Sequence, residues 1–221
     1  MASLRERYAD VFGHGRMTER VVFFSDAVFA IALTLLVIDL RVPEIDNGET
    51  SFDVIVGLLP GFLAYVISFA VIAINWNGHH RKFRVINGFD SRLIQLNFLL
   101  LFLIAFTPFP TSLISEYPGE VASVVLYASV IMALNLVQLA MWAYAWHHDL
   151  IDKLVEPDLY RYVVRNLLAV PIVFGSSIVV AVLWDPNIAM YWWLLSVPAT
   201  IVAGRLGAHQ KSRNGVQRTG N

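Results

Sequence analysis

RVVFFSDAVFAIALTLLVIDL, residues 20–40, is an apolar run with charged residues only near its two ends. At a rise of about 1.5 Å per residue, an α-helix of this length covers the roughly 30 Å hydrocarbon core of a bilayer. Arg20, Ser25 and Asp26 lie in its first third, and a charge inside a membrane helix costs at least a few kcal/mol unless it faces protein or water. The run therefore predicts a membrane helix whose polar residues are received by neighbouring helices.

Bulky side chains recur along one face of this predicted helix. At about 100° per residue, Phe24, Ile31, Leu35 and Ile38 share a narrow stripe, and Thr34 lies at its edge. Such a stripe serves packing or lipid contact in most membrane helices, but it can also line a pore when several copies surround one axis. Periodicity alone favours packing.

The rest of the chain is also apolar. The 221 residues are 57% hydrophobic, with a mean hydropathy of +0.61. Six separate runs also approach or exceed membrane-spanning length, so the sequence predicts an all-α, polytopic membrane protein with six transmembrane helices. The expected spans are about 20–40, 54–77, 93–114, 121–146, 160–183 and 188–206. Residues 1–19 are expected to form a polar cytosolic segment, and residues 207–221 a disordered cytosolic tail.

The distribution of basic residues indicates the orientation of the helices. With the N-terminus in the cytosol, 15 of the 16 Lys and Arg residues fall on cytosolic segments and only Arg41 lies outside. The positive-inside rule therefore predicts an even number of spans with both ends of the chain in the cytosol.

Prolines are expected to interrupt several of these helices. Pro60 is predicted to kink the second span, and Pro171 to bend the fifth. Pro108 and Pro110 are predicted to end or bend the third span, so that its outer end is irregular. Pro198 lies inside the sixth.

Arg20, Phe24, Ser25 and Asp26 form an Arg-x-x-x-Phe-Ser-Asp motif at the start of the first predicted helix, with the apolar run 27–36 behind it. In motif and position this resembles the signature of the transmembrane-protein-175 family of potassium channels. Weaker support comes from the end of the second span, at Trp76, His79 or His80, and Phe83, and from the Pro-Phe-Pro-Thr end of the third.

The resemblance implies a potassium-preferring cation channel with passive, leak-like conduction of K⁺ and other monovalent cations. For a chain with one six-helix unit it implies a homotetramer in the lipid bilayer. The first helix of each copy would line the pore, and an aliphatic constriction would act as gate and filter. The family's constriction falls here on Ile31, Leu35 and Ile38, with Thr34 as a polar contributor.

No Thr-Val-Gly-Tyr-Gly sequence occurs in the chain, so the predicted channel lacks a re-entrant pore loop with rings of carbonyl groups. Its selectivity is therefore expected to be modest. The competing classes are a proton-coupled secondary transporter and a proton channel. A transporter is disfavoured because the expected midplane is aliphatic and no paired repeats are found.

The polar residues of the motif are interpreted as structural rather than as ion ligands. Arg20, Phe24, Ser25 and Asp26 are expected to meet polar residues of the second and third spans, among them Asn97, and so to hold the first helix against its neighbours. A proton relay through Asp26 is the alternative.

Two histidine pairs, His79-His80 and His147-His148, lie at the cytosolic ends of the second and fourth spans. Adjacent histidines occur in metal sites and pH sensors, but a membrane di-iron enzyme needs more His and Glu ligands than this chain offers. Interface anchoring or helix-end capping is favoured for the histidine pairs.

No enzyme activity, metal, cofactor or nucleic-acid partner is expected. The expected location is a prokaryotic cell membrane, which the chain would cross several times.

Overall fold

The computed structural model describes residues 14–39, 51–117 and 119–202 of the chain. Most of the predicted N-terminal segment, the predicted tail and the acidic residues 44–50 therefore lie outside the described residues.

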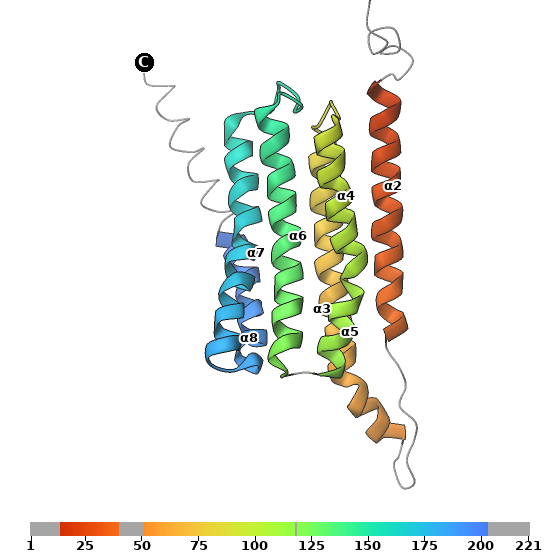
Figure 1. Ribbon diagram of the computed structural model, residues 1–221, viewed down its shortest axis with the longest axis vertical. Coiled ribbons are helices and arrows are strands. Elements are labelled where there is room, and N and C mark those ends of the chain that lie inside the picture. The colour runs from red at the N-terminus through yellow and green to blue at the C-terminus, as the bar shows by residue number, and fades with distance from the viewer. Residues whose placement is uncertain (1–13, 40–50, 118, 203–221) are drawn as a thin grey trace, which may run out of the picture.

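The described residues form a bundle of long helices that run side by side (Figure 1). Helix α2 lies at one edge of the bundle, α7 and α8 lie at the other, and α3 to α6 lie between them. This confirms the prediction of an all-helical chain. The elements, in order, are α2 (His14–Leu35), a 3₁₀ turn η1 (Leu36–Asp39), α3 (Ser51–Phe83), α4 (Ser91–Phe106), α5 (Pro108–Glu116), α6 (Val121–His147), α7 (Pro157–Leu183), α8 (Pro186–Trp192) and a 3₁₀ turn η2 (Trp193–Leu195).

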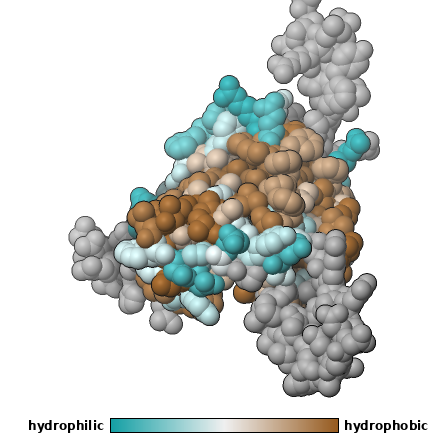
Figure 2. All heavy atoms as spheres, turned by 60° about the horizontal axis from the view of Figure 1, so that its bottom comes forward, coloured by the Kyte–Doolittle hydropathy of each residue, from teal (hydrophilic) through white to brown (hydrophobic). Residues whose placement is uncertain are grey.

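Among the described residues, four helical segments are long and apolar enough to cross a membrane. They are Glu19–Ile38, Ser91–Glu116, Val121–His147 and Pro157–Leu183. These agree with the first, third, fourth and fifth predicted spans. The other two predicted spans coincide with α3 and with the helical residues 186–202, and their crossing of a membrane stays a prediction. Figure 2 shows a broad hydrophobic surface with hydrophilic residues gathered above and below it, as a bilayer requires.

The first helix differs from its prediction at both ends. It begins at His14 rather than Arg20 and runs through Gly15. A glycine costs a helix only about 1 kcal/mol relative to alanine, which the long helix behind it offsets. At the other end, the α-helix tightens into the 3₁₀ turn η1 at Leu36.

The third predicted span is divided at Thr107. Helix α4 ends at Phe106 because Pro108 has no amide hydrogen with which to continue the helix. The irregular outer end that was expected is instead the regular helix α5, since proline is well suited to the first position of a helix. The Thr107 hydroxyl donates to the Leu103 carbonyl at 2.8 Å across the break.

The sixth predicted span is also not one uninterrupted α-helix. Its first part, α8, is capped by Asp185, whose carboxylate accepts from the amides of Asn187 and Ile188. The 3₁₀ turn η2 separates α8 from the helical residues 196–202. Pro198 cannot donate to the carbonyl of Leu194, which explains the loss of regular α-helix at this level.

The core lies mainly between α4 and α6. Leu93, Leu100 and Ile104 form one buried stripe of α4, and Leu134 and Trp142 are buried on α6. Because α7 packs along α6 and α2 packs on the other side of α4, the chain forms one continuous bundle.

Candidate functional site

Helix α2 has one face buried in the bundle and one face uncovered. Ser25, Phe29, Ala32 and Leu36 are at most 1% exposed, and their spacing of three to four residues places them on one side of the helix. The aliphatic stripe predicted from the sequence lies on another side. Its side chains are exposed: Ile31 58%, Leu35 41% and Ile38 67%, with Thr34 also exposed.

The 3₁₀ turn changes the geometry of this stripe at its end. Leu35 is the last residue of α2, and Ile38 lies in η1. In a 3₁₀ helix, residues three apart are eclipsed and each residue rises about 2 Å. Ile38 therefore lies almost directly beyond Leu35, roughly 6 Å along the axis, so the stripe stays straight to its end.

Thr34 stands at the edge of the stripe with its hydroxyl hydrogen already engaged. Its Oγ1 donates to the Ile31 carbonyl at 2.8 Å. Because a hydroxyl has one hydrogen and two lone pairs, the Thr34 oxygen keeps acceptor capacity for water or a cation.

On the buried face, a chain of hydrogen bonds joins α2, α3 and α4. The Nε2 atom of His79 lies 2.9 Å from Oδ1 of Asn97, and Nδ2 of Asn97 donates to Oγ of Ser25 at 3.0 Å. The Ser25 hydroxyl donates to the Val21 carbonyl at 2.8 Å. Ser25, His79 and Asn97 are at most 2% exposed. These residues are called the α2–α4 polar chain below.

The directions of these hydrogen bonds indicate which tautomer His79 adopts. Since the Ser25 hydrogen is used on Val21, Ser25 accepts from Asn97, and Oδ1 of Asn97 must accept from His79. His79 therefore carries its hydrogen on Nε2. Its Nδ1 is buried and has no hydrogen-bond partner among the described residues, while its ring stacks on Phe83 with centroids 3.9 Å apart.

Asp26 is held separately, by the second helix. Nε1 of Trp76 on α3 donates to Oδ1 of Asp26 at 2.8 Å. Phe24 makes an edge contact with Phe98 of α4 at 5.8 Å between ring centroids. Arg20 is exposed and makes no hydrogen bond or ion pair with a described residue. The structure thus brings four of the five predicted cluster residues onto contacts between helices and leaves Arg20 apart.

A second polar connection, between α3 and α6, was not predicted from the sequence. Nε2 of Gln138 donates to Oδ1 of Asn75 at 2.6 Å, and Nζ of Lys82 donates to Oε1 of the same glutamine. Together with Trp76 and His79, Asn75 and Lys82 recur every one to three positions near the end of α3. That clustering of polar residues at one end of α3 was the available signal.

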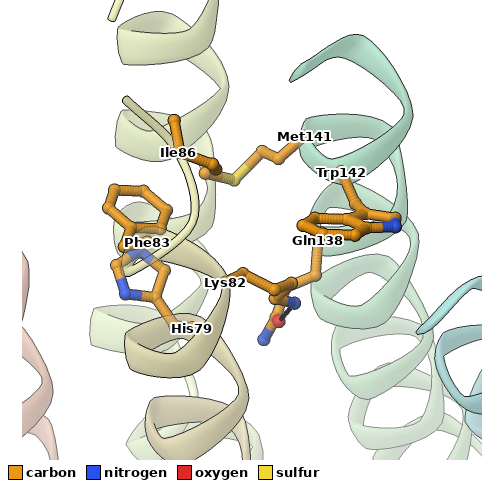
Figure 3. A pocket seen from close by; sticks show the side chains of 7 residues that line it. All are labelled: His79, Lys82, Phe83, Ile86, Gln138, Met141 and Trp142. Atoms are coloured by element: carbon orange, nitrogen blue, oxygen red, sulfur yellow. Dashed lines mark hydrogen bonds between the residues drawn. The ribbon is translucent and has the colours of Figure 1, made fainter. Parts of the chain in front are cut away.

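A small cavity of about 10 Å³ lies beside this connection, between α3 and α6 (Figure 3). Lys82 and Gln138 extend toward each other from the two helices, with Met141, Trp142 and Ile86 around them. The volume is close to the minimum that a single water molecule needs. The cavity is therefore no candidate for an organic ligand or a cofactor.

The histidine pairs do not meet in the described bundle. His148 Nδ1 lies 3.0 Å from the Tyr144 carbonyl at the end of α6, which is the geometry of a helix-end cap. Nη2 of Arg84 lies 3.0 Å from Nε2 of His80 at the end of α3. Within residues 14–39, 51–117 and 119–202, no group of three or more His, Cys, Asp or Glu side chains is placed to hold a metal ion.

Membrane-length helices, an apolar outer surface and buried polar contacts between helices define a multi-pass membrane protein. Residues 20–108 match the family described as endosomal/lysosomal potassium channel TMEM175. A potassium channel of Streptomyces collinus is 39% identical over 62% of this chain and 68% of its own length. The chain belongs to the TMEM175 family.

Other similar proteins differ in their stated ion. The crystal structure of a lysosomal potassium-selective channel TMEM175 homolog from Chamaesiphon minutus has a TM-score of 0.66 and 29% identity, and covers 88% of this chain and 98% of that one. The endosomal/lysosomal proton channel TMEM175 of Homo sapiens is 34% identical over 64% of this chain and 30% of its own length.

Replacing Asn97 with alanine is expected to lower the free energy of unfolding by about 2 kcal/mol, because it leaves the buried His79 N–H without an acceptor. The measurement is the melting temperature of the purified protein in detergent. Gln95→Ala is the matched control, since Gln95 is an exposed amide on the same helix. Equal shifts for the two variants would contradict a stabilising role for Asn97.

Asp26→Ala removes the acceptor of the Trp76 N–H, whereas Asp26→Asn keeps an oxygen in the same place. Asp26→Ala is expected to lower the melting temperature and to change K⁺ flux, with Asp26→Asn close to the wild type in melting temperature. Unchanged folding and conduction in Asp26→Ala would mean that Asp26 does not position α2.

Proposed function

We propose that this chain forms a passive, leak-like, potassium-preferring cation channel in which α2 of each copy lines the pore. Four copies around one axis would bring four uncovered faces of α2 together. Membership of the TMEM175 family and the similarity to a bacterial potassium channel support the proposal. The number of four copies rests on the family resemblance, which implies a homotetramer for a chain with one six-helix unit.

The proposal depends mainly on the orientation of α2 about its own axis, which decides which of its faces is exposed. Polar contacts hold Ser25 inside the bundle, and this leaves Ile31, Leu35 and Ile38 exposed on the surface of the chain. An aliphatic stripe on a membrane helix can also face lipid. The Phe-Ser-Asp motif directly before the stripe, in a chain of this family, favours the pore.

Ile31, Leu35 and Ile38 would form successive apolar rings around the axis. A narrow apolar constriction resists wetting, so an ion crosses it only at the cost of losing part of its hydration. K⁺ is larger than Na⁺ and holds its water less strongly, which favours K⁺ at such a barrier. The Thr34 oxygens would offer partial compensation beside the rings.

The proposal places the protein in a prokaryotic cell membrane with both ends of the chain in the cytosol. Monovalent cations and the bilayer are then its partners, and conduction needs neither a cofactor nor a bound metal. The acidic outer residues, among them Glu116, Glu120 and Asp185, would raise the cation concentration at the outer mouth.

Ile31→Asn is expected to raise K⁺ flux by about tenfold, which corresponds to about 1.4 kcal/mol taken off the barrier, or to abolish the preference for K⁺ over Na⁺. The reason is that an amide hydrates an apolar ring. The measurement is K⁺ and Na⁺ flux into liposomes that contain the purified protein.

Ile172→Asn is the matched control for this experiment. Ile172 is 66% exposed on α7, and α7 lies across the bundle from α2 (Figure 1). Flux that responds equally to both substitutions, or to neither, would remove Ile31 from the conduction path.

Proton conduction is the second candidate function, because the vertebrate relatives are named proton channels. Asp26 is the ionisable residue of the motif, and only its Oδ1 is engaged by Trp76. If protons pass through Asp26, acidification of K⁺-free liposomes, followed with an internal pH dye, is expected to be fast for the wild type and slow for Asp26→Asn. Equal rates for the two would exclude this relay, and flux that requires a coupled proton gradient would instead indicate a transporter.

A further inference from the structure

Two loops meet at the end of the bundle where α3 ends and α4 begins, the upper end in Figure 1. One loop, residues 84–90, connects α3 to α4, and the other, residues 148–156, connects α6 to α7. Ile86 and Ile151 form an antiparallel β-bridge between them. These two loops are called the inter-loop clamp below.

The clamp is held by backbone and side-chain hydrogen bonds. The Asn87 amide donates to the Leu150 carbonyl at 2.9 Å, and the Asp152 amide donates to the Val85 carbonyl at 2.8 Å. Nδ2 of Asn87 also donates to Oδ2 of Asp152 at 3.1 Å. Segments about 65 positions apart in the chain are therefore joined in register.

The last residue of the first loop, Asp90, links the start of α4 to α6. Oδ1 of Asp90 accepts from the Leu93 amide at 2.8 Å and so caps the start of α4. Oδ2 of Asp90 accepts from the hydroxyl of Tyr144 on α6. Partial burial acts against ionisation, but these hydrogen bonds outweigh it and hold the pKa of the Asp90 carboxyl below its usual value. The start of α4 is thereby attached to the end of α6.

Helix α4 continues from this attachment to the polar chain that holds α2. Asn97 follows Asp90 by seven residues, which is two helical turns, or about 10 Å along the axis. At that level Nδ2 of Asn97 donates to Ser25 of α2. A shift of the start of α4 would be transmitted through these two turns to Ser25, because a short helical segment moves as a rigid body.

We propose that the inter-loop clamp positions α2 through α4, so that the state of the clamp sets the ion selectivity of the pore. The proposal rests on the proposed function, since it requires α2 to line the pore. Tyr144, Asp90 and the bridge residues are positioning residues in this proposal, because none of them lies on the uncovered stripe of α2.

The clamp combines a buried isoleucine pair with a side-chain hydrogen bond at the surface. The Asn87 and Asp152 side chains are accessible to water, which competes for their hydrogen bond. The amide of Leu154 and the side chain of Asn87 keep the pKa of the Asp152 carboxyl below its usual value, so this acceptor stays ionised near neutral pH. A partner or ion that competes for either loop would shift the clamp.

A reversible cross-link tests the proposal within one folded sample. The bridge hydrogen bonds flank Ile86 and Ile151, which makes them a non-hydrogen-bonded pair. Such pairs have Cα atoms about 4.5 Å apart, which is within the range of roughly 4.4–6.8 Å that disulfides adopt. The natural chain contains no cysteine. The triple variant Ile86→Cys/Asn87→Ala/Ile151→Cys therefore has only one possible disulfide within each chain, and when reduced it lacks the isoleucine pair and the Asn87 side-chain bond.

The variant is reconstituted into liposomes, and K⁺ and Na⁺ fluxes are measured before and after reduction. The oxidised form is expected to keep the wild-type preference for K⁺ over Na⁺, and reduction is expected to lower that preference about threefold, within the range seen for residues that couple to a distant site. The same liposomes are compared, so differences in folding do not contribute. The corresponding variants with one cysteine each are the controls for the reductant.

The same preference in the oxidised and reduced forms would overturn the proposal. Tyr144→Phe provides a second test, since it removes only the hydroxyl that donates a hydrogen bond to Asp90. Its matched control is Tyr162→Phe, because Tyr162 is 43% exposed on α7. A lowered K⁺ preference in Tyr144→Phe but not in Tyr162→Phe supports the clamp, and indistinguishable fluxes for the two overturn it.

Failure of the clamp and failure of the proposed function give different results. Wild-type liposomes without K⁺ flux would overturn the channel function, and the clamp proposal with it. K⁺-preferring flux in the wild type that responds neither to the cross-link nor to Tyr144→Phe would leave the channel function standing and remove the clamp alone.

Discussion

The amide of Asn97 is the interaction on which the arrangement of the bundle depends. It accepts a hydrogen bond from the His79 N–H and donates one to the Ser25 hydroxyl, so this one side chain links α2, α3 and α4. In a buried apolar site no water replaces a lost partner, and an unpaired polar group there costs more than the bond contributes when it is made. Rotation of α2 would leave these groups unpaired. The aliphatic stripe is therefore held on the outside of the chain, where a second copy or lipid can cover it.

Other helix contacts follow the same logic. The hydroxyls of Ser68, Thr111 and Tyr127 join α3, α5 and α6 within the core, and Gln138 joins α6 to α3. Lipid tails are as apolar as the helices, so burial from lipid contributes little to helix association in a membrane, and packing and polar contacts become decisive. These bonds do more to set which helices are neighbours than the bulk hydrophobicity of the chain does.

The sequence was informative where a local pattern was sufficient. Apolar runs predicted the membrane-length helices because each must satisfy its own backbone in lipid, and the pair Pro108 and Pro110 predicted the break in the third run. The same reasoning failed at η1 and η2 and at the start of α2. Whether a chain tightens to 3₁₀ or continues as α-helix differs by little energy per residue, and contacts from other helices settle it.

By itself, the sequence determined the helical class, the approximate positions of the helices, the Phe-Ser-Asp motif and the aliphatic stripe at 31, 35 and 38, because each is a matter of composition and spacing along one helix. The tertiary structure decided which partner each polar residue takes: Asn97 for Ser25, Trp76 for Asp26, and the loop of residues 148–156 for that of 84–90. Such pairings join residues 50 or more positions apart. They depend on how helices are rotated and placed in three dimensions, which no periodicity within a single segment records.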